Sequence, residues 1–475
     1  MKFTILSHAG MLVEDRGKSI LIDPWLVGSC YWRSWWNFPE IEREFLDDIK
    51  PDYIYLTHLH WDHFHSPSLR LFDKDVKFLV PKIPGTRMVR DLRAIKRTNI
   101  VEIPHGGKYE LWENCSLHSF QFGLFAADTA CVISDGETTL FDANDCKTFG
   151  LPLRQITRRF PKIDFVFRSH SSATPFPYCV KNYEETFADF RTKQDYIEEF
   201  ANFSAATGAK YAIPFASNHC FLHRETKKFN DTAVDPQMVS AFFNSEMNSN
   251  RDDAECVVMI PGSSWSREVG FKLREFDYAD KDLILNQMSE KYDGKLQEYY
   301  EKEAQTKADF KAFERYFTKF LAASPSVLRK NLLPKVLFKT SDFDGEKFFL
   351  LDCPNKRVTA LDCDTDDVDA KITVPAIVLM ACVRQKMFSV WSASKRLEIE
   401  IVRGGLSKMN ALLSFLDFYE NEGLPLRNNF SARNLPIWLG RWREAVEAVQ
   451  LVVRHKIFGR KLVISELYKR KGVRS

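Results

Sequence analysis

The sequence predicts an α/β fold built on sheets, followed by a helical segment and a small α+β region. Short apolar and β-branched runs alternate with helical or loop segments over residues 1–275. Residues 296–323 carry aromatic side chains at three- and four-residue spacing, as an amphipathic helix does, and strand-like runs return between residues 335 and 403. A chain of 475 residues exceeds the size of most single cores, so we expect more than one domain.

In chain order, the strands predicted in the first part are residues 19–26, 53–57, 76–81, 130–134, 138–144, 165–169, 211–215 and 256–262. The expected division is an α/β domain over residues 1–275, a helical connector over 276–330 and an α+β domain over 331–475. Residues 372–401 are similar to sterol-carrier-type domains, although a plain packed α+β domain explains them equally well. A basic tail, 454–474, closes the chain.

Composition limits the classes of function. The chain is 45% hydrophobic and 28% charged with a net charge of +3, which does not favour a nucleic-acid partner. Its first apolar run is too short for a signal peptide, and no run approaches the roughly 20 apolar residues of a membrane span. The ten cysteines show no disulfide-like spacing. We therefore expect a cytoplasmic protein without a membrane span.

Histidines are concentrated in the stretch "YIYLTHLHWDHFHSP", residues 53–67, which holds four of the eleven in the chain. His58 and His60 follow a predicted strand and project to the same side, while Asp62 and His63 lie on the next turn. One pair can bind one cation and the other pair a second. Imidazole and carboxylate ligands suit zinc or iron better than calcium or magnesium.

This H-x-H-x-D-H string at the end of a strand resembles the metallo-β-lactamase superfamily, and "DPWL" at 23–26 and "SHAG" at 7–10 look like its N-terminal hairpin. The resemblance is closer to the CMP-N-acetylneuraminate hydroxylases, sialic-acid monooxygenases, over about residues 5–265. It is carried also by "CYWRSWW", "ADTACVI", "NDCK", "SSATPFP" and "IPFASNHCFLH". It implies an αββα sandwich with a dinuclear metal site at one rim.

The resemblance also implies further ligands. His58, His60, Asp62 and His63 match the central metal-binding string, and Asp145 in "FDANDCK" matches the aspartate that bridges the metals. His223 in "NHCFLH" matches the last histidine ligand, with His219 as a competitor.

One departure concerns a ligand. Where the family has a histidine, this chain has Phe125 at or near the position, and Asp128 is the nearest possible replacement. A carboxylate there would favour iron over zinc, and a turn-capping role for Asp128 is the alternative.

A second departure concerns electrons, because the hydroxylases carry a Rieske-type iron–sulfur domain ahead of the metallo domain. Here the metallo domain is expected from residue 1, and no C-x-H occurs in the chain. We expect any electrons to come from a separate carrier protein.

Three functions remain open. In the first, two divalent metal ions, iron in preference to zinc, activate dioxygen and hydroxylate a polar small molecule, such as a nucleotide-sugar or acidic sugar. In the second, the metals generate hydroxide that attacks an ester, amide or phosphodiester, and Asp62 or Asp145 orients it. The third is a non-enzymatic scaffold that binds a partner protein.

Candidate substrate residues lie in two loops. The aromatic residues Tyr31, Trp32, Trp35 and Trp36 in "CYWRSWW", together with Arg33, could line a pocket for a ring and an anionic group, or pack beneath the loop. His170, before "SSATPFPYC", is a candidate acid or base of the pocket.

Overall fold

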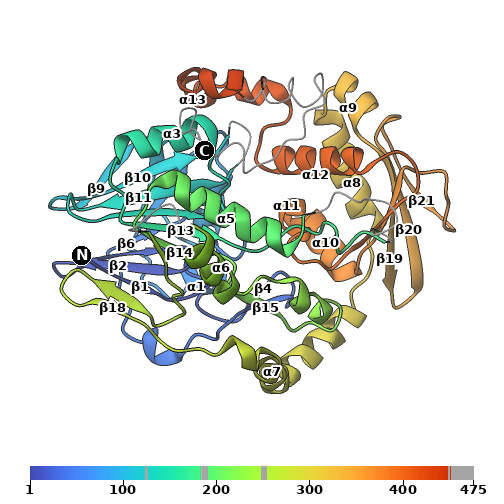
Figure 1. Ribbon diagram of the computed structural model, residues 1–475. Helices are drawn as coiled ribbons and strands as arrows, with labels where there is room; N and C mark the ends of the chain where they lie inside the picture. Colours follow the sequence, from blue (N-terminus) through green and yellow to red (C-terminus); the bar gives the residue numbers. More distant parts are fainter. Residues whose placement is uncertain (124–126, 182, 184–190, 248–253, 448–449, 451–475) are drawn as a thin grey trace.

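Two large β-sheets pack face to face in the N-terminal part of the computed structural model (Figure 1). The structure describes residues 1–475 except 124–126, 182, 184–190, 248–253, 448–449 and 451–475. Phe125 and the basic tail therefore lie outside the described residues.

The first sheet has the strand order β18-β17-β1-β2-β3-β6-β7-β8. Its strands are β1 (Lys2–Ile5), β2 (Met11–Asp15), β3 (Lys18–Ile22), β6 (Tyr53–Tyr55), β7 (Lys77–Lys82), β8 (Ile100–Pro104), β17 (Ser264–Ser266) and β18 (Gly270–Lys272). The second sheet has the order β16-β14-β13-β12-β11-β10-β9. Its strands are β9 (Lys108–Trp112), β10 (Cys115–Gln121), β11 (Thr129–Ser134), β12 (Thr139–Asn144), β13 (Phe165–Ser169), β14 (Tyr211–Phe215) and β16 (Glu255–Cys256).

Helices cover both outer faces of this pair of sheets. The inner faces meet in a core where the ring of Phe3 lies 5.0 Å from that of Phe165, between centroids. The helices α1 (Ser66–Leu69) and α2 (Arg87–Ala94) cover the first sheet, and α3 (Gly150–Arg159), α5 (Lys193–Thr207) and α6 (Pro236–Phe242) cover the second. This is the αββα sandwich of the metallo-β-lactamase fold, as predicted.

A small sheet of β4 (Ser29–Cys30), β5 (Trp35–Asn37) and β15 (His219–Phe221) connects the sandwich to the long helix α7 (Lys281–Ala304). Trp36 from β5 packs on Tyr292 of α7, with ring centroids 4.2 Å apart. The predicted aromatic helix over 296–323 is in fact two helices, since a second one, α8 (Phe310–Ala323), starts afresh. Asp309 caps α8 by accepting a hydrogen bond from the amide of Ala312 at 3.1 Å.

The C-terminal part has its own sheet, with the order β21-β20-β19-β22-β23. Its elements are α9 (Ser326–Leu332), β19 (Lys335–Asp342), β20 (Gly345–Asp352), β21 (Arg357–Leu361), β22 (Ala370–Thr373), α10 (Ala376–Gln385), α11 (Phe388–Trp391), β23 (Glu398–Ile401), α12 (Leu406–Glu420) and α13 (Asn434–Gly440). Phe313 and Phe317 of α8 pack in the same buried cluster as Phe338 and Trp391. Helix α8, which the sequence analysis assigned to the connector over 276–330, packs with the C-terminal sheet. The division into domains at residues 275 and 330 stays a prediction.

The C-terminal part packs beside the sandwich (Figure 1). Two buried arginines, Arg87 and Arg441, hold the two parts together. Arg87 of α2 donates to the carbonyls of Glu420 and Gln385 at 3.2 and 3.3 Å. Arg441, after α13, donates to the carbonyl of Gln121 at 3.0 Å. These contacts bring α11 and α12 over the rim of the sandwich that carries the histidine string.

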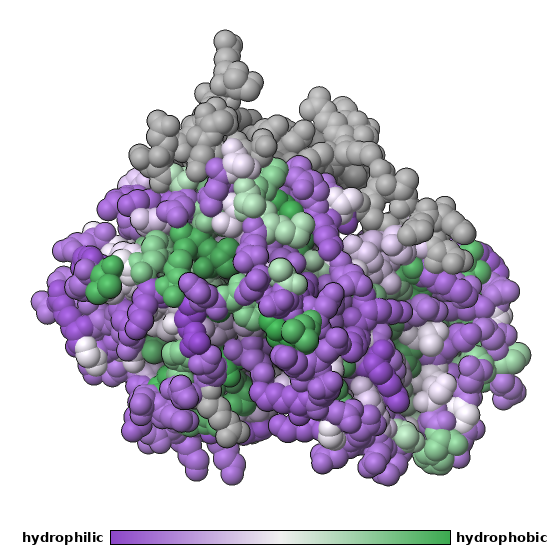
Figure 2. Space-filling view, turned by 60° about the horizontal axis from the view of Figure 1, so that its bottom comes forward, coloured by the Kyte–Doolittle hydropathy of each residue, from purple (hydrophilic) through white to green (hydrophobic). Residues whose placement is uncertain are grey.

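The face shown in Figure 2 is mostly hydrophilic, with hydrophobic residues in several separate groups. Within the described ranges, no helix combines the length and the apolar character needed to cross a bilayer.

Candidate metal centre

Strand ends of both sheets converge on one rim of the sandwich. Strands β1, β3 and β6 run in the same direction, so the residues after them lie at the same edge: His8, Asp23 and His58. In the second sheet β12 and β13 are parallel, and they end just before Asp145 and His170. The topology therefore gathers polar side chains that are distant in sequence.

Asp23 orients the start of the histidine string. Its carboxylate accepts hydrogen bonds from the Thr57 amide at 2.8 Å and the Thr57 hydroxyl at 2.5 Å. Because that hydroxyl donates to Asp23, it must accept from Nδ1 of His58, 3.0 Å away. The Nε2 atom of His58 then carries no proton, so it accepts a hydrogen bond from Nδ1 of His60 at 2.8 Å, and the same lone pair could bind a metal ion instead.

His63 is held in the same way. Its Nδ1 donates to Asp23 Oδ2 at 2.6 Å, so its Nε2 faces Asp62 Oδ2 at 3.4 Å and Asp145 Oδ1 at 3.5 Å. His63 Nε2 and Asp145 Oδ1 are buried and have no hydrogen-bond partner among the described residues. Burial opposes charge on His63, but the carboxylates of Asp145, Asp62 and Asp23 outweigh it and hold its pKa well above the ordinary value. Buried carboxylates in this number require a cation, either a proton on His63 or a metal ion.

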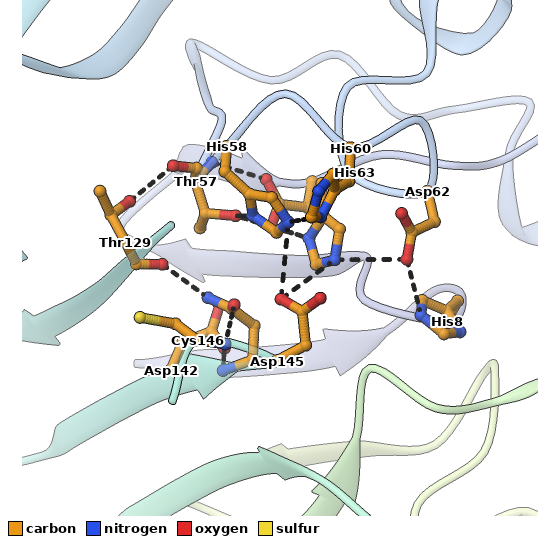
Figure 3. Close-up of polar contacts among 12 residues, drawn as sticks. His8, Thr57, His58, His60, Asp62, His63, Thr129, Asp142, Asp145 and Cys146 are labelled. Atoms are coloured by element: carbon orange, nitrogen blue, oxygen red, sulfur yellow. Dashed lines mark hydrogen bonds and ion pairs between the residues drawn. The ribbon is translucent and has the colours of Figure 1, made fainter. Parts of the chain in front are cut away.

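Two groups of possible ligands share this rim (Figure 3). The first is His58, His60 and Asp145, and the second is His8, Asp62 and His63; within each group the ligand atoms lie within 4.8 Å of one another. Asp145 Oδ1 lies 3.6 Å from His58 Nε2 and 3.5 Å from His63 Nε2, so one carboxylate oxygen faces both groups. Histidine and aspartate side chains of this kind are typical ligands of transition-metal ions, and each group could hold one.

His8 is the residue that the sequence analysis missed. It sits on the Ser7–Gly10 turn after β1, and its Nε2 lies 3.2 Å from Asp62 Oδ2. Gly10 packs against the Ser7 side chain, and a Cβ at position 10 would lie 2.2 Å from Ser7 Oγ, so that hydroxyl would have to move. The signal that could have found His8 is its place directly after a strand parallel to the one before His58.

The structure places His219 at the rim and His223 away from it. The His219 ring stacks on Trp35 with centroids 3.5 Å apart, and lies 5.2 Å from the His8 ring. His223 Nε2 instead faces Glu303 of α7 at 3.4 Å, because the chain turns away after β15. The geometry therefore favours the competitor His219 over His223.

Two further carboxylates lie beside the first group. A small cavity of about 10 Å³ is lined by His58, His60, Asp128 and Asp417, among others. Asp417 comes from α12, so the C-terminal part closes over this side of the rim. Burial and the charge of Asp128 raise the pKa of Asp417 to about 7.

His170 belongs to neither of the two ligand groups. Its side chain is buried, and its backbone amide donates to Ser217 Oγ at 3.1 Å. Burial, followed by the charge of His8, lowers the pKa of His170 to about 3. A neutral imidazole with that pKa is a weak base near pH 7, so the geometry does not favour the acid–base role expected for it.

The side chains of "CYWRSWW", residues 30–36, are divided between a cleft and the core. Arg33 lines a cleft of about 550 Å³ together with Tyr31, Trp32 and Trp61. Trp35 and Trp36 are buried, the first against His219 and the second against α7, so neither faces that cleft as expected. Tyr31 connects the cleft to the second group, because its hydroxyl donates to Asp62.

Replacing Asp23 with asparagine is expected to weaken metal binding about 10- to 100-fold. Asparagine has the size of aspartate but lacks the negative charge that holds His63. Its NH2 group is also a donor, so it disturbs the hydrogen bond that Asp23 accepts from the Thr57 hydroxyl. A competition titration against a chromophoric chelator measures the change. Unaltered affinity would show that Asp23 does not orient the ligands.

The comparisons agree with this architecture. The family model described as "Beta-lactamase superfamily domain" matches residues 2–124. A Mycobacterium tuberculosis protein described as a Rieske 2Fe-2S iron–sulfur protein is 30% identical over 280 residues, covering 56% of this chain and 53% of the relative. The cytidine monophosphate-N-acetylneuraminic acid hydroxylase of Xenopus laevis is 30% identical over 138 residues, covering 28% of this chain and 23% of its own.

Among solved structures, CmlA, a diiron β-hydroxylase from Streptomyces venezuelae, matches 54% of this chain and 52% of its own, with 17% identity and a TM-score of 0.38. Igni18, a metallo hydrolase from Ignicoccus hospitalis, matches 57% of this chain and 99% of its own, with 17% identity and a TM-score of 0.37.

The fold defines a domain of the αββα class, and its rim gathers side chains of the kinds that bind metal ions. Residues 2–124 match the beta-lactamase superfamily domain, and part of the chain is similar to the CMP-N-acetylneuraminate hydroxylases. The chain spans about half the length of the first curated relatives it matches.

Proposed function

We propose that this protein is a dinuclear iron enzyme that hydroxylates a small polar molecule with dioxygen, using electrons from an iron–sulfur carrier. The observation that carries the proposal is the position of Asp145 Oδ1. In the part of the chain that the structure describes, this oxygen has no hydrogen-bond partner, and it lies close to histidines of both candidate ligand groups. A shared carboxylate of this kind suits two metal ions a few ångströms apart.

The proposed ligands of the first metal are His58, His60 and Asp145, with Asp128 in place of the histidine expected near Phe125. Those of the second are His8, Asp62, His63 and Asp145, with His219 beside them. The three carboxylates among these ligands, Asp62, Asp128 and Asp145, favour iron over zinc, because oxygen donors and open coordination positions are typical of non-haem iron oxygenases. Bound iron would supply the redox chemistry with dioxygen.

Residues around the proposed metal site orient its ligands, exclude water and hold a proton. Asp23 fixes the His63 ring, and through Thr57 the His58 ring. Met387 and Asp417 of the C-terminal part cover the cavity beside His60 and exclude bulk water from it. Tyr31 holds a proton on its hydroxyl toward Asp62, because burial and the charge of Asp62 raise the pKa of Tyr31 well above its ordinary value.

The substrate enters, in this proposal, through the cleft lined by Tyr31, Trp32, Arg33 and Trp61. The Tyr31 and Trp61 rings stack with centroids 5.9 Å apart, and Trp32 adds a third aromatic wall. Lys295 and Lys302 join Arg33 as cations of this cleft. Aromatic walls with cations suit a planar ring that carries an anionic group, such as a nucleotide-linked or acidic sugar.

Hydroxylation consumes one dioxygen, two electrons and two protons per substrate, and yields the alcohol and one water. The proposal assigns the electrons to an iron–sulfur carrier because the matching relatives are described as Rieske proteins.

Oxygen consumption tests the proposal. Iron-loaded protein, mixed with a chemically reduced [2Fe–2S] ferredoxin, is expected to consume dioxygen faster than zinc-loaded protein and faster than the iron-loaded Asp145→Ala variant. The alternative is a hydrolase that uses the same metals to activate water. Zinc-dependent cleavage of p-nitrophenyl acetate or bis(p-nitrophenyl) phosphate, with no iron-dependent oxygen consumption, would establish the hydrolase instead.

Substituting Asp128 with alanine tests the composition of the first site. The expected iron content falls from about two to about one per chain, because the variant lacks a carboxylate beside His58 and His60. Elemental analysis gives the content. Retention of both ions would leave Asp128 as a turn residue.

A further inference from the structure

A second cleft lies between the sandwich and the C-terminal sheet. Its volume is about 490 Å³, within the range of small-molecule sites. Its walls come from the segment after β13, the segment after β15, the C-terminal end of α7, and the edges of β22 and β23. None of its lining residues belongs to either metal group. It is therefore a separate site.

Lys395 lines this cleft although its side chain is only 3% exposed. Its ammonium lies 5.6 Å from the ring centroid of Tyr178, 5.0 Å from that of Phe221 and 5.3 Å from that of Phe229. In the described part of the chain, no carboxylate pairs with it and no acceptor bonds to its Nζ. A buried ammonium held only by aromatic rings lacks the counter-charge that such groups normally have.

The remaining charges of the cleft do not supply that counter-charge. Arg396 occupies the carboxylates of Glu225 and Glu303, the first at 2.9 Å. Lys181 pairs with Glu400, which does not line the cleft, at 3.3 Å. Glu398 is the third carboxylate of the lining, and it is exposed, as are the cations Arg224 and Lys228. Five cations and three carboxylates line the cleft, so it combines a surplus of positive charge with apolar walls.

We propose that this cleft binds a small organic anion, with a carboxylate or phosphate group on the Lys395 ammonium and an apolar portion against Tyr178, Phe229 and Ala376. An anion at this point would neutralise the one buried lysine that the fold leaves without a partner among the described residues. Burial lowers the pKa of Lys395 to about 8, as expected for an ammonium without a counter-ion, and a bound anion reverses that cost. The proposal does not depend on the metal centre.

Hexanoate binding to the full-length chain tests the site, with hexanol and hexylammonium as probes of the same length but different charge. Titration calorimetry is expected to show hexanoate binding to the parent chain, with little binding of the other two. Lys395→Met keeps the length and apolar character of the side chain but removes its charge, so its hexanoate binding is expected to be about ten- to hundredfold weaker. Lys395→Arg, which keeps the charge, should retain binding.

Two controls separate this cleft from general attraction of anions. Lys319→Met removes an exposed lysine on α8, and Arg33→Met removes a cation of the other cleft. Both are expected to retain the hexanoate binding that Lys395→Met loses. Equal affinity in Lys395→Met and the parent chain, or equal binding of hexanol and hexanoate, would overturn the proposal. So would the absence of hexanoate binding to the parent chain.

Discussion

Replacing Asp145 with alanine is expected to abolish the binding of both metal ions. One oxygen of this carboxylate lies 3.6 Å from His58 Nε2 and 3.5 Å from His63 Nε2, so its removal takes a ligand from each group at once. It also removes a negative charge that two positively charged ions need in a buried site. Elemental analysis after dialysis should fall from about two ions per chain to well below one.

The matched control is Asp142→Asn. Asp142 lies on β12, the strand that ends just before Asp145, and is buried, yet it belongs to neither metal group. Burial and the nearby charge of Asp23 raise its pKa well above the ordinary value, so the amide resembles the protonated acid. Asp142→Asn should keep both ions. Equal metal content in Asp145→Ala and Asp142→Asn would contradict the bridging role.

Replacing Arg396 with methionine is expected to destabilise the protein by about 3 kcal/mol, the low end of the range for breaking a buried ion pair. Arg396 is 1% exposed, and it donates to Glu225 at 2.9 Å, to Glu303, and to the carbonyl of Trp32 at 3.3 Å. Its loss leaves the buried Glu303 without its arginine. The exposed fraction of the Glu225 side chain is 40%, so that carboxylate can rehydrate and limits the loss.

The adjacent substitution Lys395→Met should have the opposite sign. Lowering the pKa of Lys395 from 10.5 to about 8 corresponds to about 3 kcal/mol of cost for the charged form in the folded state. Contacts of the ammonium with three rings offset part of this, at about 0.5–2 kcal/mol, so we expect a net gain of about 1–2 kcal/mol.

The pH dependence follows from the direction of that shift. Because the folded-state pKa is the lower one, the cost is fully present below about pH 8 and disappears by the unfolded-state value of 10.5. The stabilisation by Lys395→Met should therefore be larger at pH 7 than at pH 10. Urea unfolding of Lys395→Met and Arg396→Met, compared with the parent chain, measures the change in the free energy of unfolding for each variant. Destabilisation by both substitutions would show that Lys395 is a structural residue.

Local patterns allowed much of the sandwich to be predicted. The strands around Tyr53–Tyr55, Lys77–Lys82, Thr139–Asn144 and Phe165–Ser169 are short apolar runs that the structure pairs in the two sheets. The prediction of a strand over 256–262 was wrong, since only Glu255–Cys256 is a strand. Its two residues pair with Tyr211 and Ala212 at the edge of the sheet. Edge pairing depends on neighbours that a local pattern does not contain.

The metal groups could be predicted only where their residues are neighbours in sequence. His58, His60, Asp62 and His63 lie within one turn after β6, so their spacing reveals them. His8 and Asp417 reach the same rim from other strands and helices, through the order of the first sheet and the docking of α12. His219 and His223 are four residues apart, and only the turn after β15 decides which one faces the rim.

The most direct test of the dinuclear centre is anomalous X-ray diffraction from crystals of protein purified without added metal, recorded at the iron and zinc absorption edges. Our account predicts two iron peaks on either side of Asp145, one beside His58 and His60 and the other beside His8, Asp62 and His63. A single peak, two zinc peaks, or a metal bound at His223 would contradict it.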